Sequence, residues 1–583
     1  MGQTYIRAAL ALVLALASAC RSSGSPRTPG SAGGGTTPQP ASPAATACAP
    51  GHAGALHAPA FVRNLPTSTG WFASPLAADL HDGGGKRLVA ATYGVAVYDA
   101  AGKLLDSAPG NGQRIYAPHV VTDLDGDGIA EIVVGQGHQV FAYEWVGGRL
   151  RLKAGWPFDT TAAGQAPEVR GLAAADLAGD GHVEVVATTT QTQATSSGGA
   201  QVFVLSADGR LFQPAGTPFQ AWPRYNARTG AGGDADRNGM GHVGFGCYGL
   251  NVGIGNLDDD PALEIVVTYD NHFIQAFKMD GTALDASPWF TNRDPAWLGR
   301  RLTWGQFIRW FDPAIEDDQW HLHQGAWPSP ATGREWLQWT ASPPNVVDLD
   351  GDGRSEVVGI PNIETGEPYV TQGYAVMVLQ GAQGDGSRSA MRLPAFRTLP
   401  RGGRPMATPS GFPPIGIPAA ATVNIQGDAR PEIVVSLNDG FMYAFDAAGQ
   451  RLWRFDYTGG RALAFASEPA VADLDGDGVP EIVFTTYGAP GDASAGHLFV
   501  LSAAGALLFD VPLPNPASDG NGSGAAAAPS IDDLDGDGQL EILVQTIDHG
   551  IDVFTVPGSQ ANCLAWPTSR GGPLRTGAPS AAR

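Results

Sequence analysis

The sequence predicts an all-β fold, a single propeller of four-stranded blades, from two observations. An acidic nine-residue loop, complete or degenerate, occurs eight times along the 583 residues, between short apolar runs. Further short runs rich in β-branched and aromatic residues follow most copies, which gives about four strands per repeat. A repeat of this size must stack on its neighbours to bury its apolar face, and four-stranded sheets repeated radially form a propeller. One blade per loop gives eight blades; seven is the alternative, if the first and last repeats share a blade by exchanging strands.

Four loops are complete, with Asp at positions 1, 3 and 5, Gly at positions 4 and 6, and Glu at position 9. Four carboxylates in nine residues repel one another unless a hard cation lies among them, and calcium prefers six to eight oxygen ligands. An ordinary acidic turn is the competing explanation, but the repeated Glu at position 9 argues against it. The predicted ligands are the four acidic side chains and the carbonyl of position 7, namely Asp123, Asp125, Asp127, Ile129 and Glu131; Asp348, Asp350, Asp352, Arg354 and Glu356; Asp473, Asp475, Asp477, Val479 and Glu481; and Asp533, Asp535, Asp537, Gln539 and Glu541.

Four other copies are degenerate, and we expect weaker calcium binding in two of them. One retains Asp176, Asp180 and Glu184 but has lost the acid at position 3; the other has Asn256, Asp258, Asp260 and Glu264, with Pro261 in place of the second Gly. The loop 424–432 has only two carboxylates, and the loop that begins at Asp79 has Arg87 at position 9. These last two are predicted to be turns without metal, so the expected total is four to six calcium ions.

The strands expected beside the first complete loop are Val120–Val121 before it and Ile132–Val134 after it. The pattern Asp-x-Asp-Gly-Asp-Gly-x-x-Glu followed by Ile/Val-Val resembles the FG-GAP/VCBS repeat, and the resemblance covers roughly residues 60–577. That family builds the calcium-binding β-propeller at the head of integrin α-chains and of many bacterial surface proteins. The resemblance implies a blade scaffold with calcium at the turn between the first two strands of a blade. The closing segment 566–577 also resembles the tail that ends many bacterial members.

The N-terminal part indicates export. Residues 1–19 carry Arg7, an apolar run that is too short to span a bilayer, and the small residues Ala17-Ser18-Ala19, as in a secretory signal peptide. The stretch before Cys20 resembles a bacterial lipobox, in which Cys20 is acylated, although Ala17 stands where Leu is usual and simple secretion is the alternative. Residues 20–55 lack large apolar side chains and predict a disordered tether. The expected domains are this tether, the propeller at 56–577 and a tail at 578–583.

The expected location is the surface or periplasmic face of the outer membrane, with membrane contact only through the lipid anchor, and the expected state is a monomer. The formal net charge of −22 and the absence of a basic stripe exclude a nucleic-acid partner. If Cys20 is acylated, Cys48, Cys247 and Cys563 remain in an oxidising compartment. A disulfide between Cys48 and Cys563 would fasten the ring closure; three unpaired cysteines are the alternative.

An insertion at about 291–340 interrupts the repeat pattern and holds half of the chain's fourteen tryptophans. Exposed aromatic side chains bind sugar rings or protein hot spots, whereas buried ones would form a satellite core. Acidic residues and histidines at 316–323 could hold a transition metal or lie on a solvated helix face. The possible ligand platform consists of Trp297, Trp304, Trp310, Trp320, Trp327, Trp336 and Trp339.

No conventional catalytic motif occurs: there is no His-Glu-x-x-His, Gly-x-Ser-x-Gly, Walker loop or Cys-x-x-Cys. The sequence therefore favours a calcium-stabilised, non-enzymatic surface propeller used for adhesion or for holding an unknown protein or glycan. A secreted polysaccharide-cleaving enzyme is the first alternative, because eight-bladed propellers with similar loops occur among the rhamnogalacturonan lyases. A periplasmic scaffold or assembly factor is the second.

Overall fold

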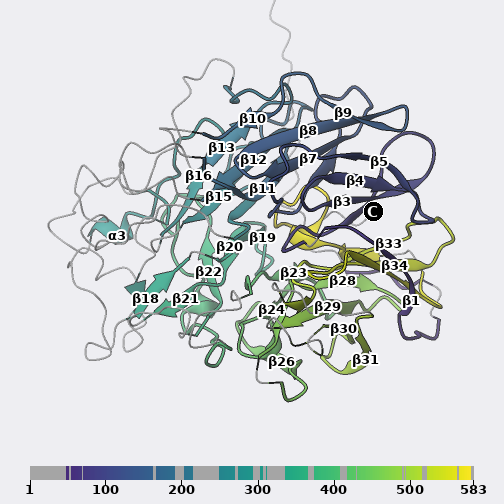
Figure 1. Cartoon of the computed structure of the whole chain (residues 1–583). Coiled ribbons are helices and arrows are strands. Elements are labelled where there is room, and N and C mark those ends of the chain that lie inside the picture. Colours follow the sequence, from purple (N-terminus) through teal and green to yellow (C-terminus); the bar gives the residue numbers. More distant parts are fainter. Residues whose placement is uncertain are drawn as a thin grey trace, which may run out of the picture. The chain divides into compact units, whose positions relative to one another are not determined.

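Strands dominate the computed structural model of this chain (Figure 1). It describes residues 47–51, 54–68, 70–161, 166–190, 202–214, 249–269, 273–292, 303–305, 310–311, 335–339, 341–364, 373–406, 416–428, 430–461, 463–488, 492, 494, 496–514, 522–560 and 563–579. The predicted signal peptide, Cys20, most of the tether and Cys247 lie outside these residues. In the described part, the helical elements are α3 (Trp289–Asn292) and two 3₁₀ turns, η4 (Pro394–Phe396) and η5 (Ser569–Gly571). No described helix has the length and apolar character needed to cross a bilayer.

Eight antiparallel sheets, numbered here in chain order, each contain one copy of the acidic loop between their first two strands. The first four sheets consist of β2 (Leu76–Asp79), β3 (Lys86–Ala91), β4 (Val95–Tyr98) and β5 (Leu104–Ala108); β6 (Val120–Thr122), β7 (Glu131–Gln136), β8 (Gln139–Val146) and β9 (Arg149–Leu152), with β10 (Phe158–Asp159); β11 (Val169–Ala175), β12 (Glu184–Thr189) and β13 (Val202–Leu205); and β14 (Val252–Gly255), β15 (Glu264–Tyr269) and β16 (Phe273–Phe277).

The other four sheets have the same strand order, with additions from the two ends of the chain. They consist of β19 (Asn345–Val347), β20 (Glu356–Gly359) and β22 (Met377–Gln380); β23 (Ala421–Val423), β24 (Glu432–Ser436), β25 (Phe441–Phe445) and β26 (Arg451–Asp456); β28 (Ala470–Asp473), β29 (Glu481–Gly488), β30 (His497–Leu501) and β31 (Leu507–Pro512), with β27 (Phe465–Ala466), β32 (Ser523–Gly524) and β36 (Cys563–Trp566); and β33 (Ser530–Asp532), β34 (Leu540–Gln545) and β35 (Ile551–Val556), with β1 (Ala60–Leu65).

Among the described residues, three of these eight sheets have fewer than four strands. In the third, fourth and fifth sheets, the expected outer strand is reduced to a single bridge, such as Leu205 with Leu211 or Phe277 with Ala283. The strands flanking the loops are where the sequence predicts them, because β-branched residues fill both faces of strands that are buried on both sides.

Successive sheets pack face to face. The first strands β6, β11, β14, β19, β23, β28, β33 and β2 each contact the next in that order. Each neighbouring pair of sheets also shares a hydrophobic cluster, and the last sheet shares one with the first, in which Val553 packs with Leu88 and Ala90. An all-β propeller satisfies both observations, because a closed series of sheets buries both faces of every sheet. The predicted fold class is therefore confirmed at this level.

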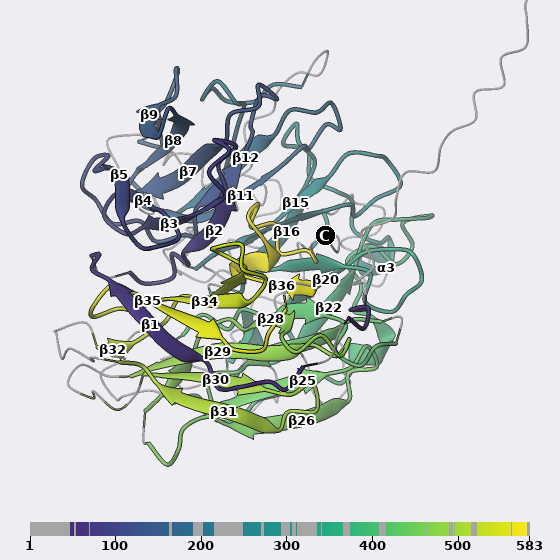
Figure 2. The same cartoon turned by 90° about the vertical axis from the view of Figure 1, so that its right-hand side faces the viewer.

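The N-terminal strand β1 closes the series. It pairs antiparallel with β35, so the outer strand of the eighth sheet comes from the start of the chain (Figure 2). An exchange of strands at the closure is what the seven-blade alternative predicts. A disulfide joins Cys48, just ahead of β1, to Cys563 in β36, as predicted. Two links, one of hydrogen bonds and one covalent, thus hold the two ends of the repeat array together.

A histidine at this closure predicts a pH dependence of stability. His549 Nδ1 lies 2.7 Å from Asp548 Oδ1, and its Nε2 lies 3.0 Å from Asp552 Oδ2, while Asn64 of β1 donates a hydrogen bond to Asp552 Oδ1. Burial opposes the charged imidazole, but the two carboxylates outweigh burial and raise the pKa of His549 to about 9. Because the folded-state pKa exceeds the unfolded value of about 6.5, protonated His549 stabilises the fold, and this contribution is complete below about pH 6.5. It is lost as the pH rises through about 9.

A His549→Gln variant should therefore be less stable than the wild type at pH 6, by on the order of 3 kcal/mol at most, and the difference should shrink toward pH 9.5. Denaturant melts of both proteins in saturating calcium measure this difference. The exposed His57, changed to Gln, is the control. A difference between wild type and variant that stays constant with pH would contradict the assignment.

The C-terminal segment 566–577 runs along the first strands of the sheets. Its carbonyl groups accept hydrogen bonds from backbone N–H groups of five strands, β33, β6, β11, β14 and β19: Ile531 to Pro567, Val121 to Pro573, Ala174 to Leu574, Ile254 to Thr576 and Val346 to Gly577. Trp566 pairs with Val471 of β28. One segment thus contacts the inner strands of six sheets, and it occupies the position where an open central channel would otherwise lie.

Three fully buried side chains anchor this segment. Trp566, Arg570 and Arg575 are at most 2% exposed. The Glu468 carboxylate accepts hydrogen bonds from Trp566 Nε1, Ser569 Oγ and the Arg570 backbone N–H, at 3.0, 2.8 and 2.7 Å. Arg570 Nη1 donates to Asn345 Oδ1 at 2.7 Å, and Arg575 Nε donates to the His119 carbonyl at 2.8 Å. Buried charges of this kind persist only where hydrogen bonds satisfy them.

The insertion contributes a separate small sheet of β17 (Trp310–Phe311), β18 (Glu335–Gln338) and β21 (Asn362–Glu364). Two of its tryptophans, Trp304 and Trp339, are 0% exposed and pack with Val266 and Met377 in one hydrophobic cluster. The ligand-platform hypothesis is therefore wrong for these two, because they are core residues. Trp297, Trp320 and Trp327, and the group at 316–323, lie outside the described residues, as do the side chains of Trp310 and Trp336.

Candidate metal centres and a polar pocket

The acidic loops share one hydrogen-bonded framework. In the loop 123–131, Asp123 Oδ1 accepts from the Gly126 N–H and its Oδ2 from the Gly128 N–H, both at 2.8 Å. The two glycines have φ angles of 76° and 84°, a conformation that side chains disfavour. Glu131 opens β7, and its Oε2 accepts from the Leu124 N–H at 2.8 Å. The Glu at position 9 makes the same bond to position 2 in seven loops.

Five of the eight loops bring at least three ligand oxygens within 4.8 Å of one another. They comprise the four complete loops and the degenerate loop 256–264; the grouped residues are Asp123, Asp125 and Asp127; Asp258, Asp260 and Glu264; Asp348, Asp350 and Glu356; Asp473, Asp475 and Glu481; and Asp533, Asp535 and Asp537. The ligands expected in the degenerate loop 176–184, Asp176, Asp180 and Glu184, do not form such a group among the described residues. The described residues of the loops 424–432 and 79–87 form no such group either.

The electrostatics of these loops favours a cation. Burial, together with neighbouring aspartates, raises the pKa of Glu356 and of Glu481 to about 8 and that of Glu541 to about 7. In addition, Glu264 Oε1 and Asp125 Oδ1 are buried and have no hydrogen-bond partner among the described residues. Carboxylates that are buried, crowded and short of donors are stabilised by a hard cation with oxygen preference, so the residues present fit calcium. Calcium there would supply charge neutralisation and a rigid turn.

Two of the five loops already contain a basic side chain from another strand. Lys153, which follows β9, places its Nζ 2.8 Å from Asp125 Oδ2 and 3.0 Å from Glu131 Oε1. Lys278, which follows β16, places its Nζ 2.6 Å from Asp258 Oδ2 and also bonds to Asp260. Neither lysine is marked by a local motif, but the chain has only four lysines in all, so their scarcity is the one signal in the sequence that points to them.

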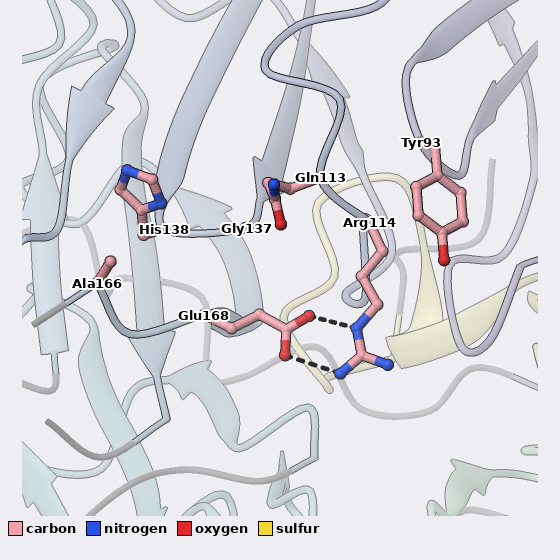
Figure 3. Close-up of a pocket in the computed structure, with 7 residues that line it drawn as sticks. All are labelled: Tyr93, Gln113, Arg114, Gly137, His138, Ala166 and Glu168. Atoms are coloured by element: carbon pink, nitrogen blue, oxygen red, sulfur yellow. Dashed lines mark hydrogen bonds and ion pairs between the residues drawn. The ribbon is translucent and has the colours of Figure 1, made fainter. Parts of the chain in front are cut away.

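A polar pocket of about 400 Å³ is formed by the residues drawn in Figure 3. The strand order places it at the edge of the sheets opposite the acidic loops. The acidic loops follow the first strands, whereas the pocket residues precede first strands or lie in the turns between second and third strands. The first three sheets all contribute to it, and its lining comprises Tyr93, Gln113, Arg114, Gly137, His138, Ala166 and Glu168. No local sequence motif marks this pocket, because it is assembled from three repeats.

An ion-pair network forms one wall of the pocket. Arg114 binds both oxygens of Glu168, with its Nε at 2.5 Å and its Nη2 at 2.9 Å (Figure 3). Arg170 Nε donates to Glu168 Oε2 at 2.7 Å, and its guanidinium lies 4.0 Å from the ring centre of Tyr116. Burial would raise the pKa of Glu168, but the two arginines outweigh it and lower that pKa. Tyr93, which is 42% exposed, lies on the same side of the pocket as Arg114 (Figure 3). The pocket thus offers a fixed charged pair and an aromatic face.

Two parts of this chain match family models of a known repeat. Residues 123–187 match the model of an FG-GAP-like repeat, and residues 465–501 match that of an FG-GAP repeat. A search of curated protein sequences found no match. Among solved structures, the chain is similar to BamB from Moraxella catarrhalis, with 12% identity, a TM-score of 0.39, and coverage of 85% of this chain and 98% of that chain.

Two further solved structures are also similar to this chain. The Dos1 propeller is similar at 10% identity and a TM-score of 0.40, with 86% of this chain and 96% of that chain covered. The exotype rhamnogalacturonan lyase YesX is similar at 16% identity and a TM-score of 0.29, with 86% and 68% covered.

Proposed function

Because this chain is an FG-GAP repeat β-propeller protein, we propose that it is a non-enzymatic, calcium-stabilised binding module, exported and held at the cell surface by acylated Cys20. The observation that carries the binding role is the polar pocket described above. Its volume of about 400 Å³ falls within the usual range for small-molecule sites. The ligand proposed is a glycan, since an exposed aromatic ring beside charged hydrogen-bonding groups suits the apolar face and the hydroxyl groups of a sugar.

The pocket is preorganised for such a ligand. Glu168 is held by Arg114 and Arg170, and its backbone N–H donates to Thr190 Oγ1 at 3.0 Å, so the charged wall is fixed before a ligand arrives. Calcium at the opposite edge of the sheets would rigidify the connections between first and second strands. We propose that its role is structural, and that the pocket side chains contact the ligand directly.

The blade count is a finer part of the proposal. We take each of the eight sheets that carry an acidic loop as one blade, because each is a separate hydrogen-bonded sheet. The alternative of seven requires the first and last sheets to merge into one blade. The first sheet retains four strands of its own, and β1 joins the last sheet. An experimental density map viewed down the propeller axis decides between the two counts.

The binding proposal is tested on an array of plant and bacterial oligosaccharides with the calcium-loaded protein. Tyr93→Ala and Arg114→Gln should each weaken binding at least about tenfold, the loss of roughly 1.4 kcal/mol that one good contact contributes. Phe61→Ala is the matched aromatic control, because Phe61 is 43% exposed and lies outside the pocket. Arg149→Gln is the charge control, since Arg149 forms only a surface ion pair with Asp106.

Three outcomes are informative. Binding that both pocket variants retain would place the ligand elsewhere. No glycan bound by the wild type would favour a protein ligand, to be sought by crosslinking in membrane fractions. The appearance of unsaturated sugar ends on incubation would favour the polysaccharide-cleaving alternative, for which His138 and Tyr93 are the pocket's proton-transfer groups.

A further inference from the structure

Lys153 occupies the centre of an acidic loop whose sequence is complete. Its ammonium lies 2.8 Å from Asp125 Oδ2, 3.0 Å from Glu131 Oε1 and 3.3 Å from Glu144 Oε1, and its side chain is only 6% exposed. The backbone fixes this placement, because the Lys153 N–H donates to the Ala142 carbonyl at 2.9 Å. Three carboxylates thus surround one buried ammonium group, and two of them belong to the predicted calcium ligands.

Lys278 places its ammonium group in the acidic loop 256–264 in a similar way, but it follows a different strand of its sheet than Lys153 does. Lys278 follows the third strand of its sheet and lies opposite Glu264 in the strand register, since Ile265 pairs with Phe277. The equivalent position in the second sheet is Glu144, which pairs with Glu131. There the lysine comes instead from the end of the fourth strand. The second and fourth sheets thus each place an ammonium group in their acidic loop, but the lysine follows a different strand in each sheet.

The first loop carries its own cation as well. Arg87, at position 9, binds Asp82 with its Nη2 3.0 Å from both carboxylate oxygens. The remaining lysines reach no complete loop: Lys86 pairs with Asp532, one residue before the loop 533–541, and Lys103 is exposed in a turn of the first sheet. No lysine is therefore available to the loops 348–356, 473–481 and 533–541.

We propose that Lys153 and Lys278 are built-in cations that replace calcium in the loops 123–131 and 256–264, so that the tight calcium sites are the three loops 348–356, 473–481 and 533–541. A calcium ion that enters the loop 123–131 or the loop 256–264 must displace a tethered ammonium group, whose effective concentration is high. Calcium dependence is then confined to the second half of the chain. The first three sheets, which form the pocket, are held together without the ion.

Titration of calcium alone into chelator-treated protein tests this inference. The wild type should bind three ions tightly rather than four to six. Lys153→Met should gain one tight site, and Lys278→Met should gain one as well. Both variants should lose thermal stability in chelator and recover it with calcium, because calcium then neutralises the exposed cluster of carboxylates. Lys103→Met is the matched control and should keep three sites.

A second measurement on the wild type does not depend on a variant that folds. Reductive methylation followed by mass spectrometry should leave Lys153 and Lys278 protected both in chelator and in millimolar calcium, while Lys103 reacts fully. Five equivalent tight sites in the wild type, or lysines 153 and 278 as reactive as Lys103 in calcium, would overturn the proposal. Neither readout involves a pocket ligand, so the result is independent of the proposed binding function.

Discussion

Removal of calcium should lower the melting temperature of this protein by roughly 8 °C. Calcium at a hundred times its dissociation constant stabilises a fold by about 2.7 kcal/mol per site, so three sites give about 8 kcal/mol. An unfolding entropy of about 2.1 cal/mol/K per residue over roughly 500 residues gives about 1 kcal/mol per degree, if the propeller unfolds as one unit. Scanning calorimetry in chelator and in excess calcium measures the shift.

Variants that disable one loop at a time measure how much each calcium site contributes to the shift in melting temperature. Asp475→Asn retains the hydrogen bond from the Asp477 N–H but removes a charge from the loop 473–481, and should reduce the chelator-sensitive shift by about a third. Asp428→Asn, in the two-carboxylate loop 424–432, is the control and should leave the shift unchanged. A melting temperature that is the same with and without calcium would show that the loops are turns and not metal sites.

Truncation of Arg570 should destabilise the fold by about 3 to 5 kcal/mol, the usual cost of breaking a buried charged network by removing one partner. Its guanidinium donates to Asn345 Oδ1 and to the carbonyls of Val252 and Pro344, so Arg570→Met leaves three buried acceptors on two sheets short of a donor. Denaturant unfolding of the variant measures the loss. Hydrogen exchange should also increase in β14 and β19, because these are the strands to which the Arg570 side chain bonds.

Arg149→Met is the matched control for this variant. Arg149 is 69% exposed and pairs with Asp106 at the surface, and such pairs contribute about 0 to 1 kcal/mol. If the two variants were equally stable, the C-terminal segment would be a passive tail. Increased exchange limited to residues 566–577 themselves would lead to the same conclusion.

The sequence by itself determined the features that local chemistry controls. The spacing of Asp, Gly and Glu in 123–131 is sufficient to specify the turn, because each carboxylate binds backbone groups only a few residues away. The alternation of this loop with short β-branched runs determined the strand order, since a strand such as β7 is buried on both faces and tolerates little else. The pairing of Cys48 with Cys563 was one of two alternatives that the sequence left open, and the structure decides for it.

Only the tertiary structure decided what depends on residues far apart in the chain. Trp304 and Trp339 are core residues because the insertion folds against the fourth and fifth sheets, which no local pattern reveals. The pocket joins Tyr93 to Glu168 across three repeats, and Lys153 meets Asp125 only because the fourth strand returns beside the loop. The segment around Arg570 bonds to strands more than two hundred residues away. Local sequence encodes hydrogen bonds within a turn, whereas these contacts depend on how whole sheets pack against one another.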